Sequence, residues 1–155
     1  MLPNRSLSRF LFLPTLLCVA CQHHPTAADP DSGAARQEGT PAITGIVWRL
    51  DQIQYGDDTL LKPEDPARYT LELLPDGRAA VRADCNRGGG TYVLNGSSLS
   101  LKVLASTEAA CPPESLDDRY KKALNQAASW MLRDGKLHIA MALDSGILSF
   151  SPAPK

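Results

Sequence analysis

The sequence predicts an α+β fold, a single domain in which a curved and mostly antiparallel sheet packs on one main helix. From residue 43 onward, short runs of alternating apolar and polar residues are separated by turn sequences, which is typical of antiparallel strands. One later segment instead repeats its apolar residues with a helical period. The chain has 155 residues, which is enough for one domain with appended segments.

The predicted strands alternate between a core side and a solvent side. The strongest turns between them are Asn95-Gly96 and Asp134-Gly135, because these dipeptides favour the backbone of tight hairpins. Pro75 to Gly77 is a third turn sequence. The strands are expected at 44–50, 69–74, 78–84, 91–94, 99–103, 129–133, 136–142 and 146–150.

The helix is expected directly after Pro112-Pro113. Prolines suit the first turn of a helix, and the acidic residues Asp117 and Asp118 complement its positive end. The apolar residues of this segment recur on one helical face, which we expect to lie against the sheet. They are Leu116, Tyr120, Ala123, Leu124 and Ala127.

The first twenty residues have the parts of a secretory signal peptide. They begin with a segment that carries Arg5 and Arg9 and no acidic residue, continue with an apolar run, and end on the small residue Ala20. A helix that spans a bilayer needs about 20 apolar residues, and this run is much shorter. We therefore predict that residues 1–20 are a signal peptide, and that the mature protein has no transmembrane helix.

The end of the signal peptide, Leu17-Cys18-Val19-Ala20-Cys21, resembles the lipobox of bacterial lipoproteins. Cys18 stands where most lipoboxes have Leu, but only Cys21 follows a small residue. The resemblance implies that Cys21 is acylated, and several acyl chains would hold the protein firmly in a membrane. Gln22 in place of Asp favours the outer membrane, on the periplasmic side. The alternative is an ordinary signal peptide cut near Ala20, with Cys21 a free thiol.

Residues 21–42 are predicted to comprise the lipidated Cys21 and a flexible tether. The segment contains no large apolar residue, so it cannot bury enough surface to offset the entropy of ordering. Its r.m.s. reach is about 25 Å by random-coil scaling. His23-His24 lacks a third ligand, so we expect two solvated residues and neither a metal nor a cofactor. The folded domain is expected at 43–151, followed by a tail at 152–155.

Cys85 and Cys111 are the two cysteines of the domain, and they predict a disulfide, because an even pair in an exported protein is usually oxidised. The bridge would join the end of a strand to the residue before the helix. Two alternatives stay open. A catalytic thiol at Cys85 would need a base, and His138 is expected on the polar face of its strand. A zinc site would need more ligands than two thiols and one imidazole.

Residues 84–92, Asp-Cys-Asn-Arg-Gly-Gly-Gly-Thr-Tyr, resemble the signature of the META domain, or HslJ-like, family. The segment 107–112 is similar to the Thr-x-x-x-Cys-Pro element of that family, and 48–50 to its opening Trp-x-Leu. The resemblance covers residues from about 43 to 151. The chain departs from it at Asp84, where many members have Gly, and at Ala110, where many have Met. The motif residues carried over are Trp48, Asn86, Arg87, Gly90, Tyr92 and Thr107.

The resemblance implies a curved sheet around a helix and a link to heat shock and antibiotic tolerance, without an agreed biochemical activity. The motif has two interpretations. In the first, Asn86 adopts a left-handed turn, Gly88 to Gly90 provide positive φ angles or close backbone approach, and Tyr92 returns to the core. In the second, the glycines and Arg87 bind an anion. The phosphate-loop pattern that ends in Gly-Lys-Ser or Gly-Lys-Thr is absent.

Three functions follow as hypotheses. The first is a non-catalytic envelope lipoprotein that binds another protein or supports the outer membrane under stress. The second is a binder of a small hydrophobic molecule or lipid between the helix and the sheet. The third is an enzyme that uses Cys85 or a carboxylate as its reactive group. Nucleic acid is not expected as a partner, because the net charge is −1 and no basic stripe is present.

Overall fold

The computed structural model describes residues 42–154, so the predicted signal peptide, Cys21 and nearly all of the tether lie outside the described residues. Among the described residues, no helix is both long enough and apolar enough to cross a membrane. The elements are β1 (Val47–Tyr55), β2 (Leu60–Leu61), β3 (Tyr69–Leu73), β4 (Arg78–Ala83), β5 (Asn86–Asn95), β6 (Ser98–Ser106), α1 (Asp117–Leu124), β7 (Ala127–Arg133), β8 (Lys136–Met141) and β9 (Gly146–Pro152), with short 3-10 turns at Pro66–Arg68 and Ala142–Asp144.

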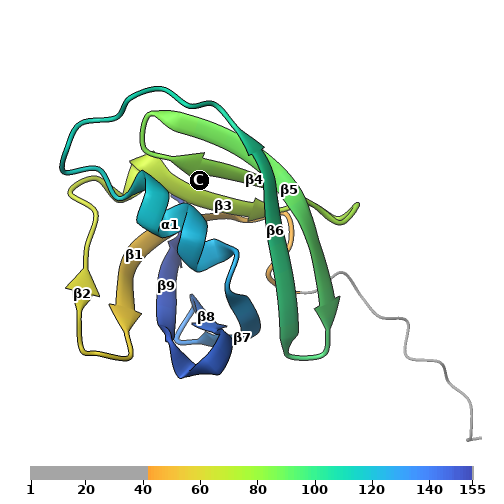
Figure 1. Ribbon diagram of the computed structural model, residues 1–155. Helices are drawn as coiled ribbons and strands as arrows, with labels where there is room; N and C mark the ends of the chain where they lie inside the picture. Colours follow the sequence, from red (N-terminus) through yellow and green to blue (C-terminus); the bar gives the residue numbers. More distant parts are fainter. Residues whose placement is uncertain (1–41, 155) are drawn as a thin grey trace, which may run out of the picture. The chain divides into compact units, whose positions relative to one another are not determined.

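The strands form a closed antiparallel barrel (Figure 1). Each strand from β3 to β8 pairs with the next, and β1 pairs with both β3 and β9. The short β2 only extends one edge of β1. The α+β prediction with one main helix is confirmed, but the curved sheet is a barrel. Alternation of apolar residues identifies the inner face in either architecture, whereas closure depends on β1 meeting the last strand of the chain.

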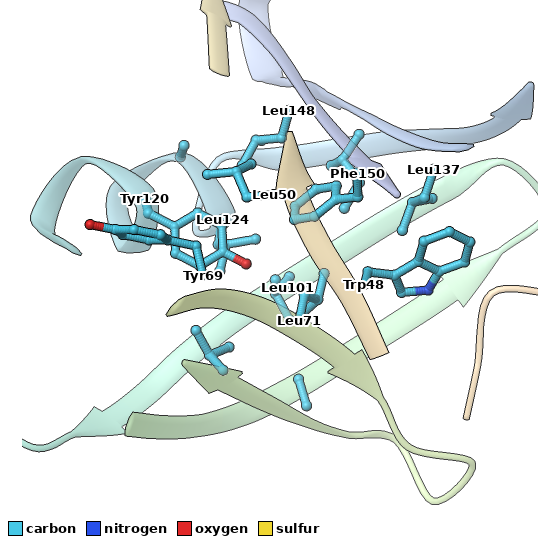
Figure 2. Packing of buried hydrophobic residues seen from close by; sticks show 14 of the residues in the cluster. Trp48, Leu50, Tyr69, Leu71, Leu101, Tyr120, Leu124, Leu137, Leu148 and Phe150 are labelled. Carbon is cyan, nitrogen blue, oxygen red and sulfur yellow. The ribbon is translucent and has the colours of Figure 1, made fainter. Parts of the chain in front are cut away.

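The interior of the barrel is filled by side chains. Trp48, Leu50 and Phe150 are nearly or fully buried on β1 and β9, and Figure 2 shows them with the residues they pack against. The alternation in β4 and β8 is confirmed, because Ala79, Val81 and Ala83, and likewise Leu137, Ile139 and Met141, all belong to the core cluster. Removing this apolar surface from water provides the main stabilisation of the domain.

The helix α1 packs on the barrel, in contact with β4 and β6. Tyr120, Ala123 and Leu124 are buried and join the core cluster, as the helical period predicts. The predicted helix is too long, because α1 ends at Leu124 and Ala127 is the first residue of β7. The Asn125 side chain accepts a hydrogen bond from the Val103 backbone N–H (2.8 Å), so it ties the end of the helix to β6.

Several strand boundaries also differ from the prediction, most of all in β1, β5 and β9. The first strand is β1 at Val47–Tyr55 rather than 44–50, and Thr44 only bridges to Leu73. The strand expected at 91–94 begins earlier, at Asn86. At the other end of the domain, β9 extends to Pro152 and the Ala153 backbone N–H donates to the Val47 carbonyl oxygen. The Asp134-Gly135 hairpin agrees with the sequence, since both residues have positive φ (53° and 74°), whereas in the other hairpin Asn95 pairs with Ser98 and the turn is formed by Gly96 and Ser97.

For the two buried tyrosines of the core, we expect removal of the hydroxyl group to change the free energy of unfolding in opposite directions. Within 42–154 the Tyr120 hydroxyl has no hydrogen-bond partner, whereas the Tyr69 hydroxyl lies 3.3 Å from Ser115 Oγ and accepts from the Leu116 N–H at 2.9 Å. We expect Tyr120→Phe to raise the free energy of unfolding by about 1 kcal/mol and Tyr69→Phe to lower it by about 1 kcal/mol. Urea unfolding of both variants measures this difference, and a greater loss for Tyr120→Phe would contradict it.

Candidate functional site

Of the predicted site residues, Cys85, Asn86, Thr107 and Cys111 meet where β5 begins and where the segment before α1 crosses it. Cys85, between β4 and β5, forms a disulfide with Cys111, which confirms the predicted pair. The two thiols are therefore joined, and Cys85 is not a free nucleophile or a zinc ligand in this structure. No group of three or more metal-ligating side chains occurs among the described residues.

The Asn86 side chain is the centre of this region. It is buried, with 2 % of its surface exposed, and each of its polar atoms is hydrogen-bonded. Its Oδ1 accepts from the Ala109 backbone N–H (2.8 Å) and from the Thr107 hydroxyl (3.0 Å). Its Nδ2 donates to Asp117 Oδ2 (2.8 Å) and to the Ala109 carbonyl oxygen (3.1 Å). One side chain thus connects β5, the segment at 107–109 and the start of α1.

Asp117 extends this network to a cation on the helix. Its carboxylate lies 3.0 Å from Lys121 Nζ, one turn further along α1. Burial alone would raise the pKa of Asp117, but the hydrogen bonds from Lys121 and Asn86 and the charge of Lys121 outweigh burial and lower it. Asp117 is therefore ionised at neutral pH and pairs with Lys121. The carboxylate has its partners inside the fold and is a structural anion rather than a proton donor.

A second carboxylate, which is buried, lies at the corner between β4 and β5. Asp84 is 4 % exposed, forms an ion pair with Arg68, and donates its backbone N–H to the Arg68 carbonyl oxygen (2.7 Å). Its φ is 59°, in the left-handed region that glycine adopts most easily. The resemblance expects glycine at this position in many members, whereas here the buried Asp84 carboxylate pairs with Arg68, whose side chain is 42 % exposed.

The three glycines of the motif lie in β5 and do not form a turn, so the turn interpretation is wrong in that respect. Each is paired with β4 on one side and with β6 on the other, which leaves no cradle of free backbone amides for an anion. The predicted close approach of the backbone is confirmed. A Cβ on Gly90 would lie 2.0 Å from the Lys102 carbonyl oxygen. The left-handed residue is Asp84, and Asn86 is already in the strand.

Gly90→Ala is therefore expected to destabilise the domain by about 2 kcal/mol, because backbone atoms of β6 must move to accommodate the methyl group. Gly89→Ala is the matched control, since its Cβ would meet its nearest atom at 3.5 Å, an ordinary contact. Thermal unfolding of the two variants measures the contrast. Equal midpoints for Gly89→Ala and Gly90→Ala would show that close strand approach does not explain Gly90.

Of the other motif residues, Trp48 and Tyr92 lie outside this network, and Arg87 touches it through its backbone. Trp48 is buried in the barrel, and its Nε1 donates to the Ile43 carbonyl oxygen (2.9 Å). Tyr92 is partly buried against the core, and its hydroxyl donates to the Leu74 carbonyl oxygen (2.6 Å). Arg87 contributes only its backbone, whose N–H donates to the Thr107 hydroxyl (3.1 Å), while the residue is exposed. These contacts are structural.

A polar hollow of about 410 Å³ lies beside the network, lined by Asn86, Cys111 and residues of the helix start. Asn86, Asp117, Asp118 and Lys121, which line it, already have partners within the protein. His138, which a thiol or carboxylate mechanism would need as a base, is on β8, where Nδ1 lies 3.0 Å from Ser149 Oγ. The arrangement of the motif is a brace between β5 and α1, without a nucleophile and base in contact.

Sequence reasoning did not identify Asp117 or Asp84 as members of the site. The position of Asp117 at the helix start predicts only a favourable interaction with the helix end. Its spacing from Lys121, four residues later, is the signal that predicts an ion pair between the two. The role of Asp84 depends on Arg68, which the alternation of the neighbouring strands does not reveal. Asn86, Thr107, Cys85 and Cys111 were predicted and are brought together.

Comparison with known proteins agrees with this architecture. The family model described as "META domain" matches residues 41–154. No curated protein matches the chain significantly. A protein from Burkholderia xenovorans, solved by NMR, is similar in structure with a TM-score of 0.62 and 22 % identity, over 82 % of this chain and 98 % of that one. A DUF4847 family protein from Bacteroides vulgatus has a TM-score of 0.54 and 12 % identity, over 71 % of this chain and 94 % of that one. At these identities, the two structures show a shared fold.

Proposed function

Since the chain belongs to the META domain family, and since the signature residues of its motif brace the fold, we propose that it is a lipid-anchored envelope protein that binds another protein and catalyses no reaction. The predicted signal peptide and lipidated Cys21 would hold the domain at the outer membrane, facing the periplasm, on a tether of about 20 residues. In this position it would support the envelope under stress by holding a partner close to the membrane.

The disulfide is the observation that carries this proposal. Disulfides persist in oxidising compartments outside the cytosol, so Cys85–Cys111 supports export of the domain independently of the leader sequence. It also joins the two thiols on which the enzyme hypothesis depends. The carboxylates at the motif, Asp84 and Asp117, are both paired with a cation, which argues for structural roles.

A protein is favoured over a small hydrophobic ligand because the proposed ligand space is occupied. The side chains of Tyr120 and Leu124 on α1 are fully buried against the barrel, in contact with the same cluster as Leu101 and Phe150. Figure 2 shows this packing between the helix and the strands. Large apolar side chains are instead exposed on the outer surface, where a protein partner can reach them.

Chemical crosslinking in intact cells, followed by mass spectrometry, tests the proposal. The full-length chain is expected to yield one reproducible crosslinked envelope protein. Cys21→Ser is the matched variant: it keeps the folded domain but removes the acylated thiol, so it should shift the protein out of the membrane fraction and reduce the yield of that crosslink. Absence of any reproducible partner for the full-length chain would overturn the proposal.

A further inference from the structure

Two shallow apolar hollows lie side by side on the outer face of β7, β8 and β9. The first, of about 300 Å³, is lined by residues that include Met131, Ala140 and Ile147. The second, of about 270 Å³, shares Ala140 and Ile147 with the first and adds Tyr55 from β1. Because they share these residues, the two hollows form one continuous surface, which we call the β7–β9 face.

The β7–β9 face is accessible. Met131 is 57 % exposed and Ile147 is 44 % exposed. At one end of the face, Leu143 is 99 % exposed, next in sequence to Asp144, which lines the second hollow. Exposed large apolar residues that gather around a hollow mark interaction sites more often than isolated ones do. In the part of the chain that the structure describes, no Lys or Arg lines either hollow.

The end of the face near Leu143 is acidic. The Gly56 backbone N–H donates to the Ser145 carbonyl oxygen (3.0 Å), so the turn after β1 lies against the turn after β8. Asp57 follows Gly56 and Asp144 precedes Ser145, and Asp58 comes next in the first turn. None of these three exposed carboxylates has an ion-pair partner within 42–154. Hydrogen bonds from Thr59 lower the pKa of Asp57, which therefore stays ionised.

This charge pattern distinguishes between possible occupants of the face. An anionic lipid surface would be repelled by three carboxylates. A second copy of this chain, docked through the same face, would bring no Lys or Arg from its own hollows to pair with these carboxylates. A protein that carries Lys or Arg beside an apolar side chain would instead match both the acidic rim and the apolar floor.

We propose that the β7–β9 face is the docking surface for the protein partner, which inserts an apolar side chain over Ala140 and Ile147 and places Lys or Arg beside Asp58 and Asp144. This inference rests on the proposed function and specifies the surface and the chemistry of the partner. Binding through such a face would be centred on the apolar contact, with the charged rim setting orientation and salt dependence.

Site-specific photocrosslinking in intact cells tests the surface. A benzophenone amino acid is placed at position 131 or 143 of the full-length chain, and at position 93 as the control, because Val93 is 67 % exposed on β5. The first two positions are expected to give one discrete adduct and position 93 none. Mass spectrometry of the crosslinked peptide should show an apolar residue next to Lys or Arg in a different protein.

Three charge-altering variants make the test specific. Ile147→Arg should lower the adduct yield from positions 131 and 143 at least about tenfold, whereas Val93→Arg, on another strand, should leave it unchanged. Neutralising the rim with Asp58→Asn and Asp144→Asn together should lower it about fivefold. An unchanged thermal midpoint confirms that each variant is folded, as expected for exposed positions.

Several outcomes would overturn the surface assignment. These are an adduct between two copies of this chain, adducts with lipid only, an equal yield from position 93, or an adduct that persists in Ile147→Arg. If chemical crosslinking identifies a partner but positions 131 and 143 give no adduct with it, the proposed function stands and the β7–β9 face is wrong. If neither method identifies a partner, both proposals fail.

Discussion

Replacing Cys85 and Cys111 together with alanine is expected to lower the free energy of unfolding by about 3.5 kcal/mol. The bridge joins residues separated by 26 positions, and opening it allows the unfolded chain many more conformations. Small domains are stable by only about 5–15 kcal/mol, so this loss is a large fraction of the total. Urea unfolding of the oxidised protein and of the double variant measures it.

The reduced wild-type protein is the control for this prediction. Because reduction opens the same loop without changing any side chain volume, the reduced protein should unfold at nearly the same urea concentration as the double variant. Asn86 still connects β5 to the segment before α1 in both, so each should remain folded at low temperature. A double variant that unfolds at the same urea concentration as the oxidised protein would show that the disulfide does not stabilise the domain.

Asn86→Ala is expected to lower the free energy of unfolding by about 3 kcal/mol. The substitution leaves the Ala109 N–H and the Thr107 hydroxyl without their acceptor, and it removes a donor from Asp117. Buried polar groups that lose their partner carry the full cost of desolvation, and here several lose it at once. Thermal and urea unfolding measure the effect.

Asn125→Ala is the matched control for Asn86. The Asn125 side chain is exposed; its Oδ1 accepts from the Val103 N–H and its Nδ2 donates to the Lys121 carbonyl oxygen (3.0 Å). Water can replace both bonds, so we expect a loss of about 0.5 kcal/mol. If Asn86→Ala cost no more than Asn125→Ala, the motif would not be a brace between β5 and α1, and its residues would be available for another role.

The parts of the fold that depend on local pattern could be predicted from the sequence. The faces of β4 and β8 follow from alternation, because each inward residue must avoid water while its neighbours face it. Asp134-Gly135 predicts a hairpin because both residues accept positive φ angles. The disulfide followed from the number of cysteines and the expected compartment, since Cys85 and Cys111 were the pair left in an exported domain.

The rest depended on contacts between distant segments. Closure of the barrel requires β1 to pair with β9, which no local pattern encodes. For Gly88 to Gly90 the sequence allows either positive φ angles in a turn or close backbone approach, and only the pairing of β5 with β6 decides for close approach. Asp84 and Arg68 form an ion pair at the corner between β4 and β5. Asp84 is buried there only in the complete fold, so the local sequence does not show that its carboxylate needs a partner.

The residues that stabilise the fold differ from those that we propose to bind a partner. The signature residues of the family stabilise the domain through Asn86, Gly90 and the disulfide, so they explain the fold and not a reaction. A protein partner would instead contact residues on the outer surface of the barrel. The β7–β9 face, with its apolar floor and acidic rim, is one such surface.

The intact mass of the mature protein, taken from the membrane fraction and treated with a thiol-alkylating reagent before any reduction, tests the central claim most directly. A lipid-anchored, exported domain predicts a chain that begins at Cys21, carries acyl groups there, and gains alkyl groups at Cys85 and Cys111 only after reduction. A chain that begins elsewhere without lipid, or one alkylated at both domain cysteines without reduction, would contradict it.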